Sequence, residues 1–281
     1  MLKTGARWLA GVVAVLCVVL VGPSVPADAP AGRSLPAGAA RDVVAANRVM
    51  TWNICNPCDE SNVDRAAAIA AFAPQVVGLQ EACTRDVDRI RDDLESRYGL
   101  VYHVEYGMVL RSWARCGGVP WNPGGYGEAI LSAAPMTDRV HAEYPDGGSE
   151  DRGYLAVTTV VDGRPVRVFN THLAERRQEE VRADQARVLA AKVAPYEHAV
   201  VLGDFNARAD AAELAPLWSL AADADPRCRP SDADACEPTT DWYSRFDYVF
   251  LRGVTALTHG VRPTPVSDHH LLHADLDLDR A

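Results

Sequence analysis

The stretch Gly203-Asp204-Phe205-Asn206 carries a carboxylate and a carboxamide at a spacing that could serve chemistry. The apolar run 200–202 before it is typical of a strand buried on both faces, and Gly203 permits a sharp turn at its end. Side chains two positions apart in an extended chain point to the same side, so Asp204 and Asn206 converge. This pair suits a hard cation or a phosphoryl group. The alternative is a plain turn, because glycine, aspartate and asparagine are common turn residues.

Polar residues end several other apolar runs. Asn53 lies in the β-rich run 49–54, and Glu81 follows the run 76–79. Their structural alternatives are an exposed position on an edge strand for Asn53 and an acid favouring a helix N-terminus for Glu81. His172 follows the run 166–169, where the alternative is a histidine bonded to a neighbouring carbonyl.

Two acids near the C-terminus complete the set. Asp247 lies within the apolar run 246–251, where an aspartate is costly unless it is paired or bound. Asp268 and His269 directly precede a closing strand expected over residues 271–278. Chemistry-bearing side chains therefore come from segments far apart in the chain, and each is placed by the end of an expected strand.

The first residues are typical of a secretory signal peptide. Lys3 and Arg7 precede an apolar run over residues 8–21, and small residues and prolines lead to a cleavage site near Ala27. We expect a signal peptide over residues 1–27, a flexible tether rich in alanine, proline and glycine over 28–47, and one folded domain over 48–281. The protein is accordingly expected to be secreted.

The elements expected between these motifs alternate between strands and helices. Helices are expected over 64–72, 84–97, 175–193 and 211–220, and residues 111–127 are expected to form a surface loop tied down through Cys116. Two β-rich runs around Asp162-Gly163 predict a hairpin over 154–169. The third helix should carry a solvated face of arginines, with contact to a phosphate backbone as the alternative reading; they are Arg176, Arg177, Arg182 and Arg187.

Charge and cysteine content limit the partners and the compartment. The formal net charge is −10, so long-range steering towards polyanions is absent, and binding one would need a local basic patch or bound cations. Six cysteines lie beyond the leader, an even number that favours three disulfides in an exported protein. Cys228 and Cys236 are the expected partners within one loop. Pairing among Cys55, Cys58, Cys83 and Cys116 stays open, and half a zinc site at Cys55-x-x-Cys58 lacks a second ligand pair.

Six motifs occur in one order across the domain, and together they resemble the endonuclease/exonuclease/phosphatase superfamily of DNase I-like metal-dependent phosphoesterases. They are Asn53, Gly78-Leu79-Gln80-Glu81, Asn170-Thr171-His172-Leu173, Gly203-Asp204-Phe205-Asn206, Arg245-Phe246-Asp247-Tyr248 and Ser267-Asp268-His269. The resemblance implies an α/β fold in four layers: two mixed β-sheets packed face to face, with helices on the outside.

The resemblance also implies a role for each residue. Glu81 matches the principal metal ligand, with Asn53 and Asp268 near the same ion, which would be Mg²⁺ or Mn²⁺, with Ca²⁺ as a possible assistant. The implied catalytic groups are His172, Asp204, Asn206, Asp247 and His269. Arg152, Asn206 and His172 would bind the phosphate, and Glu128 would support His172. Cys55 and Cys83 each lie two residues beyond an expected metal ligand, and one of the open pairings, a bond between them, would brace the metal site.

These roles predict a secreted, divalent-metal-dependent phosphodiesterase that acts on nucleic acid by water attack on phosphorus. Alternatives within the superfamily are a phosphomonoesterase or a lipid phosphodiesterase, acting on nucleotides, inositol phosphates or sphingomyelin. An alternative of another class, a binding module without chemistry, is disfavoured because every expected catalytic group is present. We expect a monomer without stable membrane association after signal removal.

Overall fold

The computed structural model describes residues 44–279, apart from 57, 59, 60 and 176. The chain divides into two units, Met1–Ala39 and Ala40–Ala281, and every described residue belongs to the second. The expected signal peptide lies outside the described residues, as does most of the expected tether. The end of that tether is already ordered, because strand β1 (Ala45–Asn53) begins four residues before the expected start at Val49.

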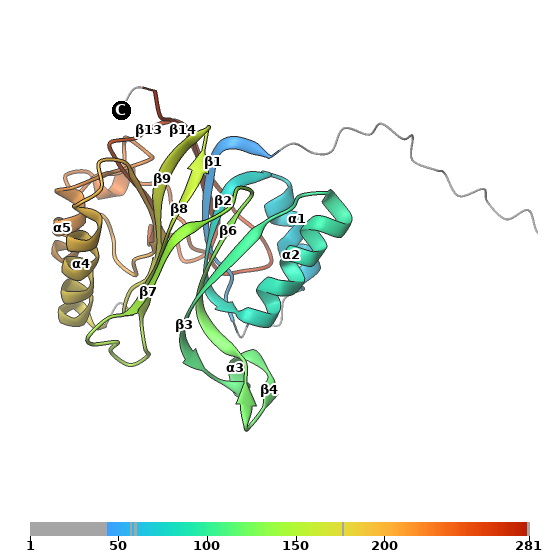
Figure 1. Ribbon diagram of the computed structural model, residues 1–281. Helices are drawn as coiled ribbons and strands as arrows, with labels where there is room; N and C mark the ends of the chain where they lie inside the picture. Colours follow the sequence, from blue (N-terminus) through green and yellow to red (C-terminus); the bar gives the residue numbers. More distant parts are fainter. Residues whose placement is uncertain (1–43, 57, 59–60, 176, 280–281) are drawn as a thin grey trace, which may run out of the picture. The chain divides into compact units, whose positions relative to one another are not determined.

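Two six-stranded mixed sheets form the centre of this unit (Figure 1). The first sheet has, in spatial order, β13 (Thr255–Arg262), β14 (Leu271–Asp277), β1, β2 (Pro74–Cys83), β6 (Gly125–Ser132) and β3 (His103–Arg111). The second sheet has β11 (Ala222–Asp223), β12 (Asp247–Arg252), β10 (Ala199–Asp204), β9 (Arg164–His172), β8 (Gly153–Val161) and β7 (Thr137–Glu143).

Helices cover the outer faces of both sheets. Figure 1 shows α1 (Asn62–Ala70) and α2 (Thr84–Tyr98) outside the first sheet. On the other side, α4 (Glu179–Val193) and α5 (Ala215–Trp218) lie outside the second sheet. Two short 3₁₀ turns complete this side, Ala212–Leu214 and Ala233–Ala235. The expected four-layer α/β sandwich is confirmed.

Three apolar cores hold the four layers together. Between the sheets, branched side chains such as Val76 and Ile130 from the first sheet meet Val168 and Leu202 from the second. The other two cores lie between each sheet and its helices, and the outer one of the first sheet includes Trp52. Strands buried on both faces read as continuous apolar runs, which is why 200–202 and 76–77 lack alternation.

Three strands bring their ends together in register. β10 pairs in parallel with β9, which sets Asp204 opposite His172, and antiparallel with β12, which sets Asp204 opposite Asp247. The β8–β9 hairpin closes through Asp162-Gly163, both with positive φ, as the Asp-Gly pair predicted. One row of polar side chains therefore crosses the edge of the second sheet.

The region expected as a surface loop over residues 111–127 is more ordered than predicted. β3 ends at Arg111, α3 (Trp113–Cys116) and the two-residue strands β4 (Gly118–Val119) and β5 (Asn122–Pro123) follow, and β6 begins at Gly125. The region connects β3 to β6. Because these two strands pair with each other, both ends of the region are fixed in the first sheet. The expectation of an irregular loop is wrong for its two ends.

Three disulfides join the six cysteines. Cys228–Cys236 is confirmed, and Cys83–Cys116 ties down the 111–127 region as expected. The remaining bond is Cys55–Cys58, which settles the pairing left open by the sequence and rules out a bond between Cys55 and Cys83. Within the described part of the chain, no helix has both the length and the apolar character needed to cross a membrane.

Candidate active site

The polar row at the edge of the second sheet forms one side of a site. His172, Asp204 and Asp247 are buried, and the His172 Nε2 atom lies 3.4 Å from Asp204 Oδ2. Asn206 has a φ of 53°, which turns the chain just past Asp204. Its backbone N–H donates a hydrogen bond to Asp204 Oδ1. The stretch is therefore a turn, as the alternative interpretation held, and this turn directs the Asp204 and Asn206 side chains to the site.

The first sheet contributes Glu81 through a distorted strand. The pairing of β2 with β6 shifts register between Leu79 and Ala82, and Glu81 has a φ of 54°, which is uncommon for a residue other than glycine. The bulge re-aims the Glu81 side chain, and α2 starts only at Thr84. The helix-end alternative for Glu81 is thus wrong.

Asn53 joins the two sheets at the site. Its Nδ2 donates to Glu81 Oε1 at 3.2 Å and to Asp204 Oδ2 at 3.1 Å, while its Oδ1 accepts the N–H of Cys55. β1 is an inner strand and Asn53 is buried, so the edge-strand alternative is wrong. In this arrangement the Asn53 amide nitrogen holds the carboxylates of Glu81 and Asp204 together.

His269 reaches the same point from the loop before β14. Its Nδ1 donates to Asp247 Oδ2 at 2.9 Å, and its Nε2 lies 3.7 Å from Asp204 Oδ2. Trp52 donates its indole N–H to the His269 carbonyl, and Ser267 Oγ accepts the His269 N–H while donating to the Asn53 carbonyl. These bonds fix the loop to β1 and orient the ring.

His172 is held by a cation. Arg152 Nη1 lies 2.9 Å from His172 Nδ1, and Asn206 Nδ2 lies 2.9 Å from His172 Nε2, so a nitrogen donor faces each ring nitrogen. Arg152 is fixed in turn by Glu150 at 2.8 Å. The expected support by Glu128 is wrong: Glu128 is buried, but among the described residues its Oε2 has no hydrogen-bond partner, since Arg152 takes the position at Nδ1.

Burial and charge set the protonation of the site. Burial, with the neighbouring Arg152, holds the pKa of His172 well below its usual value. Burial also raises the pKa of Asp204 to about 7 and raises that of Glu81. For His269 burial acts in the opposite sense, but the carboxylates of Asp247 and Asp204 outweigh it and raise the pKa to about 10. The site thus combines a neutral imidazole with a positively charged one.

The donor set fits a divalent cation. Glu81, Asp204 and Asp247 present carboxylates in one buried network, and Asp247 Oδ1 has no hydrogen-bond partner among the described residues. Carboxylate oxygens are the ligands that Mg²⁺, Mn²⁺ and Ca²⁺ prefer. Asp204, Asp247 and His269 each offer a ligand atom within 4.8 Å of the others.

Asp268 lies apart from this network. Its carboxylate is exposed and lies within 4.8 Å of the sulfur atoms of Cys55 and Cys58. In the part of the chain that the structure describes, no hydrogen bond joins Asp268 to Glu81 or Asn53. Its role as a metal ligand stays a prediction.

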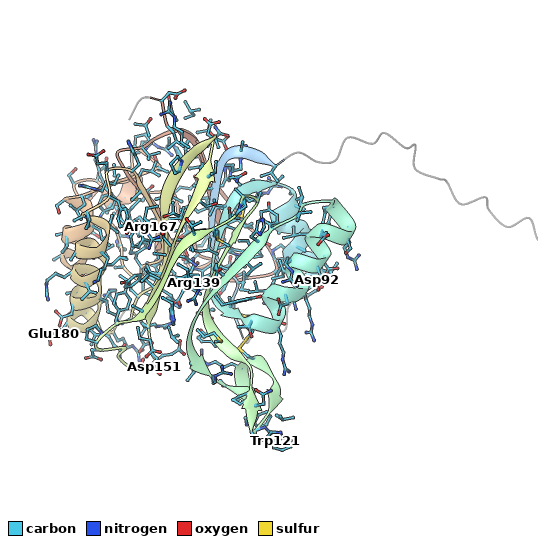
Figure 2. The ribbon with its side chains drawn as sticks, viewed as in Figure 1. Asp92, Trp121, Arg139, Asp151, Arg167 and Glu180 are labelled. Carbon is cyan, nitrogen blue, oxygen red and sulfur yellow. A yellow bond between two sulfur atoms is a disulfide. The ribbon has the colours of Figure 1, made fainter. Side chains whose placement is uncertain are left out.

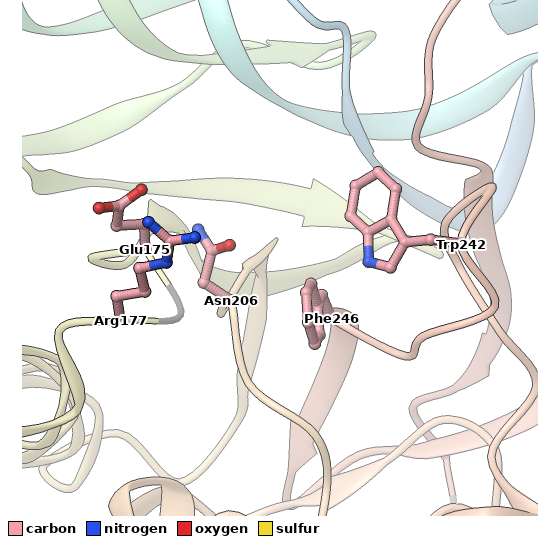
Figure 3. A pocket seen from close by; sticks show the side chains of 5 residues that line it. All are labelled: Glu175, Arg177, Asn206, Trp242 and Phe246. Carbon is pink, nitrogen blue, oxygen red and sulfur yellow. The ribbon is translucent and has the colours of Figure 1, made fainter.

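A cleft of about 660 Å³ opens beside Asn206 (Figure 3). Figure 3 shows Glu175 and Arg177 on one side of Asn206, with Phe246 and Trp242 on the other. The Trp242 and His269 rings meet edge to face, with centroids 5.4 Å apart. The sequence prediction missed Trp242 and Phe246 as site residues, although a tryptophan in a polar loop is a signal that could have suggested an exposed ring.

The expected arginine face of α4 needs a correction. Arg182 is buried rather than solvated, and it bonds to Glu213 and to the carbonyls of Ala174 and Glu175. Arg187 is exposed and pairs with Asp184, and Arg176 lies outside the described residues. Of this set, Arg177 is the one that lines the cleft.

Comparison with known families decides the identity. The model of the endonuclease/exonuclease/phosphatase family matches residues 50–269, which include every expected site residue. The chain belongs to the endonuclease/exonuclease/phosphatase family. Members of this family are metal-dependent phosphoric ester hydrolases, and the chain is an enzyme of this class. The comparison with curated proteins found no match.

Solved structures similar to this family member share its fold. An endonuclease/exonuclease/phosphatase from Beutenbergia cavernae is 25% identical, with a TM-score of 0.68 over 83% of this chain and 71% of that one. TDP2 from D. rerio, complexed with a single-strand DNA product, is 18% identical, with a TM-score of 0.64 over 82% and 98%. The human nocturnin catalytic domain with bound sulfate is 23% identical, with a TM-score of 0.63 over 84% and 96%.

Proposed function

We propose that this family member is an exported phosphodiesterase that hydrolyses nucleic acid by attack of water on phosphorus, with Mg²⁺ or Mn²⁺ as its metal. The observation that carries the proposal is the in-register row His172–Asp204–Asp247, closed by His269 and joined by Asn53 to Glu81. Export rests on the leader-like residues 1–27.

Each side chain has a task that its contacts suggest. Asp204 lies between both imidazoles and is placed to orient the attacking water and receive its proton. We assign His172, held between Arg152 and Asn206, and the Asn206 amide to a phosphoryl or leaving oxygen. His269, oriented by Asp247, contributes positive charge. A divalent ion held near Glu81 would supply further positive charge for the phosphate.

The cleft beside Asn206 supports a nucleic-acid substrate over a small phosphate ester. Trp242 and Phe246 offer aromatic surface for a base, and Arg177 offers a cation for a neighbouring phosphate. TDP2, one of the similar structures, is described in complex with single-strand DNA product. The net charge of −10 works against polyanion binding, which makes these local groups and the cation essential.

The proposal is tested by assaying purified protein with Mg²⁺, Mn²⁺ or Ca²⁺ against plasmid DNA, single-stranded DNA, RNA, nucleotides, inositol phosphates and sphingomyelin. We expect cleavage of nucleic acid that is abolished by a chelator and restored by Mg²⁺ or Mn²⁺. Release of inorganic phosphate from monoesters with nucleic acid left intact would overturn the proposal in favour of a phosphatase. Hydrolysis of sphingomyelin alone would indicate a lipid phosphodiesterase.

A further inference from the structure

A projecting arm over residues 112–124 exposes two tryptophans. The arm comprises α3, β4 and β5, and Figure 1 shows that it extends beyond the ends of β3 and β6. Trp121 is 84% exposed and Trp113 is 59% exposed, and Figure 2 shows Trp121 at the tip. An indole ring is normally buried in a folded protein. Exposed aromatic side chains on a rigid scaffold mark interaction sites.

The arm is built to hold a fixed shape. Cys83–Cys116 ties it to the start of α2, and Ser112 N–H donates to the Gly124 carbonyl across its base. A Cβ at Gly124 would lie 2.5 Å from the Cys116 carbonyl oxygen, so the two sides of the arm meet too closely for another residue there. Since the arm is ordered before any partner arrives, binding through it loses little conformational entropy.

A chain of charged contacts connects the arm to the catalytic residues. Arg115, within the arm, pairs with Glu150 and stacks over the Tyr126 ring at 4.7 Å. Glu150 also holds Arg152, which bonds to His172. Cys83, which anchors the arm through its disulfide, lies two residues after Glu81 in the sequence. The charged contacts link the arm to the residues that hold His172.

Exposed arginines flank the arm, whose own Arg115 is already paired with Glu150. Residues 112–124 contain no acid, although the whole chain has a net charge of −10. Arg111, at the base of the arm, and Arg85, beside the Cys83 anchor, are both exposed. Exposed aromatic rings with nearby arginines are the combination that binds single-stranded nucleic acid, because bases stack on the rings and phosphates meet the cations. A duplex offers only base edges in its grooves, so stacking requires unpaired bases.

We propose that the arm binds unpaired nucleotides of the substrate strand on one side of the scissile phosphate, with bases stacked on Trp113 and Trp121. This inference rests on the proposed function. It adds that the enzyme prefers substrates with a single-stranded segment long enough to reach the arm.

The test compares Trp113→Ala/Trp121→Ala with Trp113→Tyr/Trp121→Tyr and with Leu257→Ala. Leu257 is a matched control, since it is an apolar side chain 58% exposed on β13. Binding of a fluorescent single-stranded oligonucleotide of about ten nucleotides is measured with Mg²⁺ in a His269→Ala background, which prevents hydrolysis and keeps the cation. Cleavage of this oligonucleotide and of bis(p-nitrophenyl) phosphate, a diester too small to reach the arm, is measured with Mg²⁺ or Mn²⁺.

We expect the double alanine variant to bind the oligonucleotide at least about 30-fold more weakly and to show a correspondingly higher KM. The tyrosine variant should retain most of the affinity, because tyrosine also stacks. Hydrolysis of the small diester should stay within about twofold in every variant, and Leu257→Ala should match the wild type.

Two outcomes overturn the inference in different ways. If the wild type cleaves nucleic acid and the double alanine variant binds and cleaves it equally well, the arm is not a nucleic-acid surface, while the proposed function stands. If the wild type hydrolyses other phosphate esters but no nucleic acid, both fail. Sedimentation with phosphatidylcholine/phosphatidylglycerol vesicles is run in parallel. Tryptophan-dependent vesicle binding with unchanged oligonucleotide binding would assign the arm to a lipid surface instead.

Discussion

His269 depends on one carboxylate for its orientation. Asp247 accepts the Nδ1 hydrogen at 2.9 Å, and Thr239 Oγ1 in turn accepts the Asp247 N–H. Replacing Asp247 with asparagine keeps the shape but lets the amide donor face Nδ1, which favours the wrong tautomer.

We therefore expect Asp247→Asn to lower kcat by about 10²- to 10⁴-fold with a much smaller change in KM. Steady-state kinetics on a single-stranded oligonucleotide measure both constants. Asp241→Asn is the control, since Asp241 bonds to His270, which has no expected role in the chemistry. Full activity in Asp247→Asn would contradict the role given to His269.

Glu128 is a buried acid without a hydrogen-bond partner for its Oε2 among the described residues. Burial raises its pKa well above the usual value, and Arg152 offsets only part of this effect. An acid whose pKa is higher in the folded state binds a proton more tightly there than in the unfolded chain. Stability then falls as the pH rises from about 4.3, the unfolded value, towards the folded pKa.

Glu128→Gln removes this penalty, because the amide never has to ionise. We expect its free energy of unfolding to exceed that of the wild type by about 1–3 kcal/mol near pH 8, with the difference shrinking towards pH 4. Urea unfolding across this range measures the difference. Glu143→Gln, at an exposed position of β7, should change little. A variant less stable than the wild type near pH 8 but equal to it near pH 4 would show that Arg152 requires the ionised acid.

At the residue scale, sequence reasoning found the polar groups but not all of their partners. Asp204, His172 and Asp247 follow or interrupt apolar runs, which singles them out because such positions are costly for charge. The Arg152–His172 bond and the burial of Arg182 were not foreseen. Both depend on which distant segments become neighbours, and the local pattern of a segment does not contain that information.

β1 is tied to β14 by a polar pair on the outer part of the first sheet. Arg48 bonds to both oxygens of Asp275, at 2.6 and 2.9 Å, and also to the Phe72 carbonyl. The hydrogen bonds from Arg48 lower the pKa of Asp275 below its usual value. A carboxyl group with a depressed folded pKa stabilises the protein above the unfolded pKa of about 3.9, and this stability is lost as the pH falls through the folded value.

We expect Asp275→Asn to lower the free energy of unfolding at pH 7 by about 1 kcal/mol, since both side chains keep some contact with solvent that screens the pair. The difference should begin to shrink at about pH 3.9 and disappear once the pH lies below the lowered pKa of Asp275 in the folded state, where the wild-type carboxyl group is neutral as well. Urea unfolding at a series of pH values measures it. Asp279→Asn is the control, because the Arg164–Asp279 pair is much more exposed and should contribute close to nothing. An unchanged difference at low pH would rule out the charge as the cause.

At the element scale, the expected strands were those with a strong apolar pattern. The runs that became β2, β10 and the β8–β9 hairpin are buried almost throughout, so their composition alone marks them. β7 and β13 were not anticipated, because they are largely exposed and lack alternation. Such strands form because they pair with a buried neighbouring strand, and the sequence pattern of a single segment does not indicate that pairing.

The whole molecule assembles its active site from two sheets. Asn53 and Glu81 come from the first sheet, whereas His172, Asp204 and Asp247 come from the second. The motif order in the sequence indicated the family and hence the layers. It did not show what keeps the sheets in register, because apolar side chains alone allow two sheets to slide.

Asn170 provides that register. It is fully buried in β9, and its Nδ2 donates across the interface to the carbonyls of Leu79 in β2 and Ala129 in β6, both at 2.9 Å. Its Oδ1 accepts from Gln80 Nε2 at 2.6 Å. These bonds lie at the bulge that aims Glu81 and two residues before His172. Asn170 therefore joins the two halves of the site.

We expect Asn170→Ala to lower the free energy of unfolding by about 2–4 kcal/mol, because two carbonyls lose their partner in a dry interface. It should also lower kcat more than stability alone explains, since the Glu81 and His172 halves lose their alignment. Thr159→Val is the matched control: it removes the Ser132–Thr159 bond, a second buried link between the sheets at the opposite end of β8 from Arg152. Kinetics and urea unfolding are measured where both variants are folded. If Thr159→Val lowered kcat as much as Asn170→Ala does for the same loss in free energy of unfolding, any loss of contact between the sheets would be shown to lower activity. Asn170 would then have no special part in aligning the site.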